Sequence, residues 1–332
     1  MKSPKDIYTL TLLKKLILLI LLGVFIASLT RPHSKLVKFS EAQSLMASII
    51  KIDVCAEPAQ KARVKEAFQD VWKRLEDISW RMNVFDERSD VAKVNSAYPD
   101  PVPIGADTYE VLKEAIRFNQ ISLGAFDITI WPLCQLWKEA EEKNVFPSLE
   151  RIKTAQRLVG IDKVKLLENN QVKLAQDGTR IDLGGIAAGY VVDEAVRIFR
   201  GYEIRNFLID AAGDMYAGGL NCEGKPWRVG ISDPRDRSKF LGVVALSNAA
   251  VTTSGNYEQY FNIQGKSWSH IINPVTGFPQ KEVVSATVIG PRTIDADALA
   301  TAVCVLGREV GTKVIDSLGN LVDHVKMGWT HF

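Results

Sequence analysis

The spacing of apolar residues changes several times along the chain, and each change predicts a different element. From residue 64 to residue 82, apolar side chains recur every three or four positions, which predicts an amphipathic helix packed on a core. The preceding segment ASIIKIDV, residues 47–54, has the β-branched content of a strand. Two further helices, capped by Asp107 and Ser148, are expected at residues 107–120 and 148–160.

Short strands dominate the second half of the chain. Residues 164–174 predict a hairpin, because its turn residues Asn169 and Asn170 tolerate positive φ. Small residues at 182–190 lead from an expected strand into another helix. Further strands are expected at residues 207–210, 227–232, 241–246, 249–253, 260–263, 283–289 and 321–326, and two helices at residues 296–306 and 309–318. Since helices and strands follow no regular βαβ order, we expect an α+β fold with mixed, largely antiparallel sheets and packed helices.

The N-terminus differs in character from the rest of the chain. Lys14 and Lys15 precede an apolar run at residues 16–29, which is shorter than the roughly 20 residues of a spanning helix. Residues 1–30 are therefore expected to be a signal peptide, with an uncleaved membrane anchor reaching back to Leu10 as the alternative. In both cases the basic pair stays cytoplasmic, so we expect an exported protein on the periplasmic side of the inner membrane.

Charge and cysteine content narrow the classes of partner and site. A net charge of +2, from 41 basic and 39 acidic side chains, leaves no basic surplus, so we expect no nucleic-acid partner. The four cysteines lie far apart and match neither a zinc site nor a dense disulfide framework. Cys304 falls in an apolar helical pattern and is expected in the core, whereas a disulfide among Cys55, Cys134 and Cys222 stays open.

One pair of polar residues points to a metal. Asp297 and Thr301 lie four positions apart in a predicted helix, so they project from the same face. A carboxylate and a hydroxyl so placed can both reach one hard cation. The pair therefore predicts half of a magnesium site.

Three other segments combine small residues with polar or aromatic ones. Phe126 and Asp127, after Ala125, could stack on a flat heterocycle and accept its hydrogen bonds. The segment DLGGIAAGY at residues 182–190 is neither GxGxxG nor a Walker sequence, but its small residues let backbone N–H groups approach a phosphate. The Ser254 hydroxyl could also bind phosphate. Each segment has a structural alternative: a buried Phe, close helix packing and turn closure, respectively.

His270 is a candidate for proton transfer. It precedes a sharply turned segment, NPVTGFP at residues 273–279. A lone histidine is more often structural, but an imidazole beside a metal–phosphate site can take a proton from an attacking hydroxyl.

Taken in order, these segments resemble the FAD:protein FMN transferases, the ApbE-type flavin transferases. The resemblance covers residues 39–332 and implies one domain of ApbE-like, T-fold-related architecture. The segments that carry it are RMNVF at 81–85 with SDVAKVN at 89–95, GAFDITIWPLCQLW at 124–137, DLGGIAAGY, LIDAAGD at 208–214, WRVGISDP at 227–234, TTSGNYEQYF at 252–261, SHIINPVTGFP at 269–279 and DADALATA at 295–302.

The resemblance implies a magnesium-dependent reaction with FAD as substrate. A threonine hydroxyl of an acceptor protein attacks the FAD pyrophosphate, FMN becomes linked to that threonine, and AMP leaves. The implied acceptors are redox-complex subunits with a Ser/Thr-Gly-Ala-Thr-like sequence, a sequence that does not occur in this chain. Two alternatives stay open: an exported FAD pyrophosphatase that releases FMN and AMP, and a flavin-binding protein without turnover.

The resemblance also assigns site residues. Asp297, Thr301 and the backbone carbonyl of Gly185 match the magnesium ligands, and His270 matches the histidine that assists proton removal, so His270 and Asp297 are the expected catalytic residues. The positions expected to bind FAD are Met82, Ala125, Phe126, Asp127, Asp182, Ala188, Ser254, Gly255, His270 and Ile271.

Two positions depart from the family pattern. Asn273 stands where many relatives have Asp, which leaves the identity of the general base open. Ala188 stands where Lys or Glu is common, which bears on how the edge of FAD is held.

Overall fold

The structure, a computed structural model, describes residues 35–234, 236–255, 260–281, 283–319 and 324–328. The predicted signal peptide or anchor at residues 1–30 lies outside the described residues, so that prediction stays untested. Within the described part of the chain, no helix combines the length and the apolar character that a membrane span requires.

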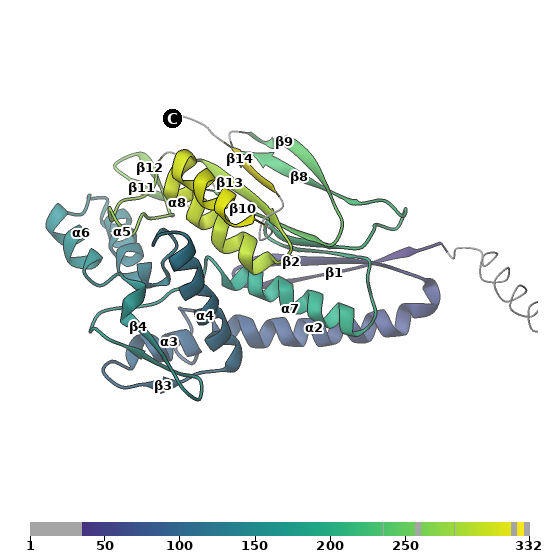
Figure 1. The fold of residues 1–332 in the computed structure, drawn as a ribbon, viewed down its shortest axis with the longest axis horizontal. Helices are drawn as coiled ribbons and strands as arrows, with labels where there is room; N and C mark the ends of the chain where they lie inside the picture. Colours follow the sequence, from purple (N-terminus) through teal and green to yellow (C-terminus); the bar gives the residue numbers. More distant parts are fainter. Residues whose placement is uncertain (1–34, 235, 256–259, 282, 320–323, 329–332) are drawn as a thin grey trace, which may run out of the picture. The chain divides into compact units, whose positions relative to one another are not determined.

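An antiparallel sheet of seven strands forms the centre of the unit that begins at Val37 (Figure 1). The first half of its β2 strand alternates between the two faces: Ile50 and Ile52 are almost fully buried, whereas Ile49 and Lys51, which precede them, are exposed. The strand order is β1 (Val37–Leu45), β2 (Ser48–Ala56), β6 (Phe207–Ala211), β7 (Asp214–Gly218), β10 (Ala249–Gly255), β13 (Ser285–Gly290) and β14 (His324–Gly328).

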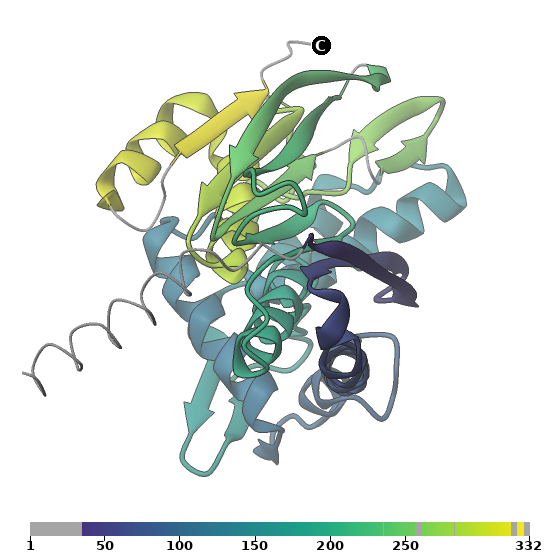
Figure 2. The ribbon, with the colours of Figure 1, turned by 90° about the vertical axis from the view of Figure 1, so that its right-hand side faces the viewer.

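Three long helices cover the buried side of this sheet (Figures 1 and 2). They are α2 (Lys61–Arg81), α7 (Ala187–Gly201) and α8 (Thr293–Ser317). The apolar stripe predicted for α2 is confirmed, because Val64, Phe68, Val71, Leu75 and Ile78 are all buried in the main core. Since α7 packs on both α2 and α8 and on the central strands β6 and β7, it is the middle one of the three helices on the sheet.

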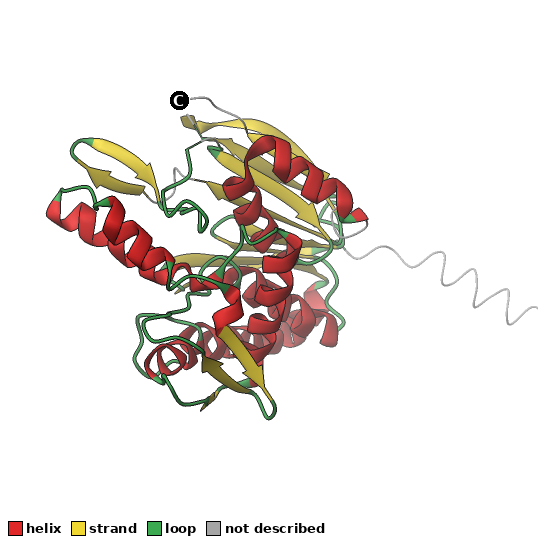
Figure 3. Ribbon diagram, turned by 60° about the vertical axis from the view of Figure 1, so that its left-hand side comes forward, coloured by secondary structure: helices red, strands yellow, loops and turns green. Residues whose placement is uncertain are grey.

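A second group of elements surrounds a smaller apolar cluster. It contains α5 (Trp131–Lys143), α6 (Leu149–Gln156) and the hairpin of β11 (Tyr260–Ile263) and β12 (Lys266–Ser269). Trp137 is at its centre, and its indole Nε1 donates to the carbonyl oxygen of Gly277 at 2.9 Å. Figures 2 and 3 both show this hairpin beside α5, apart from the seven-stranded sheet.

Shorter elements complete the fold. A three-stranded sheet lies beside α3 (Asp90–Ser96) and α4 (Ala106–Ile121), and a long hairpin of two strands lies between β7 and β10 in the chain. The strands of these sheets are β3 (Val102–Pro103), β4 (Val164–Leu167) and β5 (Gln171–Leu174), and β8 (Trp227–Asp233) and β9 (Asp236–Leu246). Single 3₁₀ turns are η1 (Pro58–Gln60), η2 (Ile128–Ile130) and η3 (Ile161–Lys163).

Most element predictions are confirmed, with some corrections. The α+β class with antiparallel sheets is right, and Asn169 and Asn170 form the hairpin turn with positive φ. Asp107 does not cap α4, because Gly105 is the N-cap and the Asp107 carboxylate binds Arg74 instead. The two helices expected near the C-terminus are one element, α8, with a break at Gly307.

Two further corrections concern segments near the predicted site. No strand directly precedes α7, because Ile181 and Asp182 belong to no strand. The strand β10 continues to Gly255, two residues beyond its predicted end, so Ser254 lies in a strand rather than in a turn. The expected last strand is β14, and the first residues of its predicted range lie outside the described segments.

The open question about cysteines is answered by one disulfide. Cys55 on β2 is bonded to Cys222 in the loop between β7 and β8. Cys304 is buried in the core as expected, and Cys134 is half-buried.

Candidate functional site

A pocket of about 1240 Å³ opens between the sheet, α8 and the α5 region. We call it the central pocket. It brings together every predicted site residue except Met82: Ala125, Phe126, Asp127, Asp182, Gly185, Ala188, Ser254, Gly255, His270, Ile271, Asp297 and Thr301. These residues come from segments up to 176 positions apart, so the fold gathers what the sequence had suggested separately.

Met82 is the exception. It is the C-cap of α2, only 4% exposed, and belongs to the main core rather than to the pocket lining. Its neighbours Val84 and Phe85 line the pocket instead.

Asp297 and Thr301 lie on one face of α8, as their spacing predicted, and both face the central pocket. Asp297 is 5% exposed, and its Oδ2 accepts a hydrogen bond from the backbone N–H of Gly189 at 3.0 Å. Among the described residues, no Lys or Arg forms an ion pair with Asp297. Burial therefore raises the pKa of this carboxyl to about 7.

The other two predicted metal donors are close to this carboxylate in the fold. The Thr301 hydroxyl lies 3.1 Å from the Ser254 hydroxyl. Gly185 is so near that a Cβ atom on it would lie 3.4 Å from Thr301 Oγ1. A carboxylate, a hydroxyl and a backbone carbonyl are the hard oxygen donors that Mg²⁺ prefers, so these residues fit a magnesium ion.

The charge of the central pocket also favours a bound cation. Its described lining contains five carboxylates (Asp127, Asp182, Asp214, Asp297 and Glu141) but only two basic side chains, Lys138 and Arg180. A pyrophosphate group here would meet more carboxyl groups than basic side chains, and a bound cation would reduce the repulsion between them.

Asp127 lines the pocket, and its side chain also holds the turn in which it lies. Its Oδ1 accepts from the backbone N–H and the hydroxyl of Thr129, at 2.8 and 2.6 Å, and its Oδ2 accepts from Ile161 N at 3.1 Å. Burial nevertheless raises the pKa of Asp127. With both oxygens engaged, Asp127 fixes the turn that presents Phe126 to the pocket.

Asp182 lies in a segment that is held from two sides. Its backbone N–H donates to Ile128 O at 2.7 Å, and its Oδ1 accepts from Gly184 N at 3.0 Å. Burial raises the pKa of its carboxyl. The side chain of Asn95, to which the sequence analysis assigned no role in the site, binds the backbone of the preceding residue, Ile181.

His270 directly follows β12 and lines the pocket, as predicted. The loop after it is shaped by Asn273, whose Oδ1 accepts from Val275 N and Thr276 N at 2.8 and 3.1 Å. Asn273 is not among the residues that line the pocket. The Asn at this position therefore serves the loop, which leaves His270 as the candidate base.

An aromatic pair at the pocket was missed by the sequence reasoning. The rings of Phe85 and Trp131 meet edge to face with centroids 5.4 Å apart, and Phe85 is 73% exposed. Lys138 Nζ lies 5.8 Å from the centre of the Phe85 ring. The signal was available, because both aromatic residues belong to the segments RMNVF and GAFDITIWPLCQLW.

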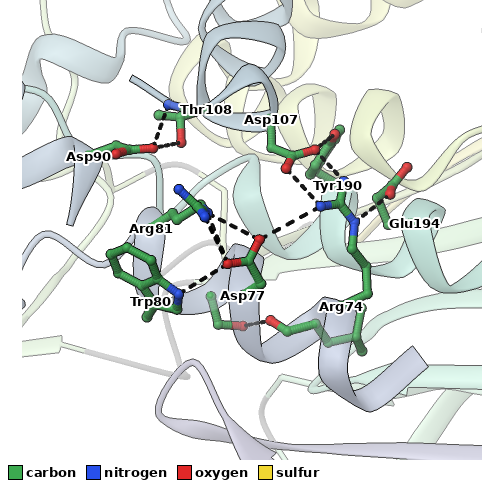
Figure 4. Close-up of polar contacts among 12 residues, drawn as sticks. Arg74, Asp77, Trp80, Arg81, Asp90, Asp107, Thr108, Tyr190 and Glu194 are labelled. Atoms are coloured by element: carbon green, nitrogen blue, oxygen red, sulfur yellow. Dashed lines mark hydrogen bonds and ion pairs between the residues drawn. The ribbon is translucent and has the colours of Figure 1, made fainter. Parts of the chain in front are cut away.

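A network of hydrogen bonds and ion pairs connects α7, the helix that carries Ala188, to α2 and α4 (Figure 4). Arg74 on α2 donates to Asp107 on α4 at 2.8 Å and to Glu194 on α7 at 2.9 Å. The Tyr190 hydroxyl, also on α7, donates to Asp107 at 2.6 Å. These bonds join three helices and hold the first turns of α7, from which Ala188 lines the pocket.

A family model described as "ApbE family" matches residues 46–324 of the sequence. The chain belongs to the ApbE family. Relatives named FAD:protein FMN transferase include those of Haemophilus influenzae, 32% identical over 77% of both chains, and Vibrio cholerae, 32% identical over 75% of both chains. A third, from Treponema pallidum, is 32% identical over 82% of this chain and 80% of its own. The prediction of an enzyme of the transferase class is thereby confirmed.

Solved structures agree with this family assignment. The ApbE protein of Thermotoga maritima superposes with a TM-score of 0.80 at 31% identity, covering 88% of this chain and 94% of that one. The flavin transferase ApbE of Vibrio cholerae gives a TM-score of 0.75 at 28% identity, over 89% and 97% of the two chains. The expected ApbE-like architecture is therefore confirmed.

Proposed function

We propose that this ApbE-family protein transfers FMN from FAD to a threonine hydroxyl of an acceptor protein and releases AMP, in a magnesium-dependent reaction. The observation that carries the proposal is the buried Asp297 carboxylate beside Thr301 and Gly185, in a pocket where carboxylates outnumber basic side chains. A passive flavin-binding site has no need of such an arrangement at a pyrophosphate.

Asp297, Thr301 and the carbonyl of Gly185 are the residues that would hold Mg²⁺. The bound cation supplies charge neutralisation for the pyrophosphate and for the phosphate that leaves.

The remaining work falls to side chains around the pocket. The threonine oxygen of the acceptor forms a bond to the phosphorus on the FMN side, the bond from that phosphorus to the bridging oxygen breaks, and AMP leaves with that oxygen. His270 takes the proton of the attacking hydroxyl. Phe126, held by the Asp127 turn, offers an apolar surface to the flat ring of the substrate.

We further propose that the protein acts after export, on acceptors with a Ser/Thr-Gly-Ala-Thr-like sequence on the periplasmic side of the membrane. Residues 1–30 supply the targeting segment, either as a cleaved signal or as an anchor. The Cys55–Cys222 disulfide supports this location, because such bonds persist in oxidising compartments and are rare in the cytosol.

The test is to incubate the purified protein with FAD and Mg²⁺, with and without an acceptor peptide that carries the motif. Covalent flavin on the acceptor by mass spectrometry, together with acceptor-dependent AMP, is the expected result. Release of FMN and AMP without acceptor would instead identify a pyrophosphatase, and intact FAD in both samples would identify a flavin-binding protein.

A matched pair of variants on α8 makes the test specific. Asp297→Ala is expected to abolish transfer without unfolding the protein, since it removes an anionic ligand rather than an apolar core side chain. Glu309→Ala removes an exposed carboxylate that pairs with Lys313 on the same helix, and its transfer rate is expected to be unchanged. Full activity of Asp297→Ala would overturn the assignment of this residue.

A further inference from the structure

The first turns of α7 and α8 cap each other. Neither helix has a side-chain cap of its own, since Ile186 and Arg292 at the two N-cap positions make no such bond. Instead, Asp193 of α7 accepts from the N–H groups of Thr293 and Ile294 at the start of α8, at 2.8 and 3.0 Å. A carboxylate at these positions satisfies N–H groups that a helix leaves unpaired.

In the opposite direction, Asp297 of α8 caps the start of α7. Its Oδ2 accepts from the N–H of Gly189 in the first turn of α7, at 3.0 Å. In each helix, the residue whose N–H is capped lies four residues before the Asp that caps the other helix. These pairs are Gly189 and Asp193 in α7, and Thr293 and Asp297 in α8. Residues at this spacing share a helix face, so the two helices meet along one reciprocal contact.

The absence of a side chain at Gly189 makes this contact possible. A Cβ atom there would lie 2.7 Å from Ile294 Cα and 2.7 Å from the carbonyl oxygen of Thr293. The backbones of the two first turns are therefore in direct contact, and any other residue would push them apart.

This contact fixes the relation between two donors of the proposed magnesium site. Gly185 lies one turn before Gly189, at the start of the same segment, and Asp297 is bonded to Gly189 itself. Among the described residues the other oxygen of Asp297, Oδ1, accepts no hydrogen bond, so it is available to a cation in the pocket. A shift of α8 along α7 would break three N–H···carboxylate bonds and displace Asp297 from Gly185.

We propose that Asp193 is a positioning residue for the cation site: it holds the start of α8 on α7 and thereby sets the place of Asp297. The inference rests on the proposed function, because it takes Asp297 as a ligand of the metal. Residues that orient a metal ligand in this way typically contribute 10- to 100-fold to metal affinity.

The test uses the full chain and a readout other than turnover. Mn²⁺ binding is followed by EPR in the presence of FAD and without acceptor, for wild type, Asp193→Asn and Asp193→Ala. We expect Mn²⁺ affinity to fall about 3-fold for Asn, which keeps one acceptor oxygen, and about 10-fold for Ala. Transfer measured over a range of Mg²⁺ concentrations is expected to shift to higher Mg²⁺ in the same order.

A control separates positioning from general loss of a helix cap. Ser148→Ala removes the N-cap of α6, whose hydroxyl accepts from Arg151 N, and its Mn²⁺ affinity is expected to equal that of wild type. A folded Asp193→Asn protein with wild-type Mn²⁺ affinity overturns the inference, even if Asp193→Ala does not fold. Failure of the proposed function gives a different result, because the wild type would then attach no FMN to the acceptor peptide, whatever its Mn²⁺ affinity.

Discussion

Asn95 holds Ile181 by both ends of its amide. Its Nδ2 donates to the Ile181 carbonyl at 2.9 Å, and its Oδ1 accepts from the Ile181 N–H at 2.6 Å. The guanidinium of Arg180 donates to the backbone carbonyl of Asn95. A single side chain at the end of α3 therefore takes the place of a partner strand for the extended segment that leads to Asp182 and Gly185.

Removing this amide is expected to cost both stability and rate. Asn95→Ala leaves the buried N–H and C=O of Ile181 without partners, which should lower the free energy of unfolding by about 2 kcal/mol. The transfer rate should fall about 10-fold, because the segment that carries Gly185 is no longer fixed. Urea denaturation and a flavinylation assay measure the two effects. Thr154→Ala, which removes an exposed hydroxyl on α6 away from the pocket, is the control, and wild-type values for Asn95→Ala would contradict the assigned role.

Arg74 is expected to control how the protein responds to acid. Burial alone would raise the pKa of Asp107, but hydrogen bonds from Arg74 and Tyr190 outweigh it and lower the pKa below its usual value. An acid with a lowered folded-state pKa stabilises the fold above its unfolded-state pKa, and this contribution is lost as the pH falls through the folded-state pKa. Stability should therefore decrease below about pH 4.

The variant Arg74→Met tests this relation. It leaves the part-buried carboxylate of Asp107 without its ion-pair partner, whereas Glu194 keeps Arg197, so we expect a loss of about 2 kcal/mol at pH 7. The loss should be smaller at pH 3, where protonation removes the unpaired charge of Asp107. Arg63→Met breaks an exposed pair with Glu203 and should change stability by less than about 0.5 kcal/mol. Equal losses for Arg74→Met at both pH values would contradict the prediction.

The close contact at Gly185 predicts sensitivity to one methyl group. In Gly185→Ala the new Cβ would lie 3.3 Å from the Phe126 ring and 3.4 Å from Thr301 Oγ1, so one of these side chains must move. We expect the transfer rate to fall about 10-fold. Gly201→Ala is a matched control on α7, because a Cβ there meets no atom within 4 Å, and its rate should not change. Equal activity of the two variants would show that the Gly185 contact does not matter.

The position of Asn273 predicts that replacing it by the Asp expected from the family pattern has little effect. Its side-chain oxygen accepts from Val275 N and Thr276 N, and an Asp oxygen can do the same. Asn273→Asp should therefore keep the transfer rate within about 2-fold, whereas His270→Ala should reduce it about 100-fold. A large rise in rate for Asn273→Asp would mean that a carboxylate at this position takes part in proton transfer.

The disulfide predicts a dependence of stability on redox conditions. Replacing Cys55 and Cys222 together by Ser should lower the free energy of unfolding by about 3 kcal/mol, because the bond closes a loop of 167 residues. Thermal unfolding with and without a reducing agent measures this effect. The agent should destabilise the wild type and leave the double variant unchanged, and an effect on both proteins would point to another cause.

The elements that the sequence predicts well are those with a strong apolar period. The stripe of α2 and the Asn169-Asn170 turn are local signals, and both are confirmed. The strands β1 and β12 were missed because their residues, VKFSEAQSL and KSWS, are mostly polar and exposed. The helix α5 was not predicted, because it begins without a capping side chain at Ile130 and with Pro132 in its first turn.

For the site, too, the sequence predicts local arrangements but not contacts between residues that are far apart in the chain. The spacing of Asp297 and Thr301 placed them on one helix face, which needed only local geometry. The roles of Asn95 and Asp193 depend on partners 86 and about 100 positions away, and no periodicity contains that information. Met82 was carried over from a family position, but here the chain turns this side chain into the core.

His270 and Asp297, the imidazole and the carboxylate of the proposed site, are supported by two different apolar clusters. His270 is carried by a loop anchored on the cluster around Trp137, whereas Asp297 projects from a helix whose neighbouring residues Ala298, Leu299 and Ala300 belong to the main core. A change confined to the small cluster can thus alter the angle at which the base meets an incoming hydroxyl while the cation end stays in place. Evolution can in this way adapt such an enzyme to a new acceptor by remodelling one module alone.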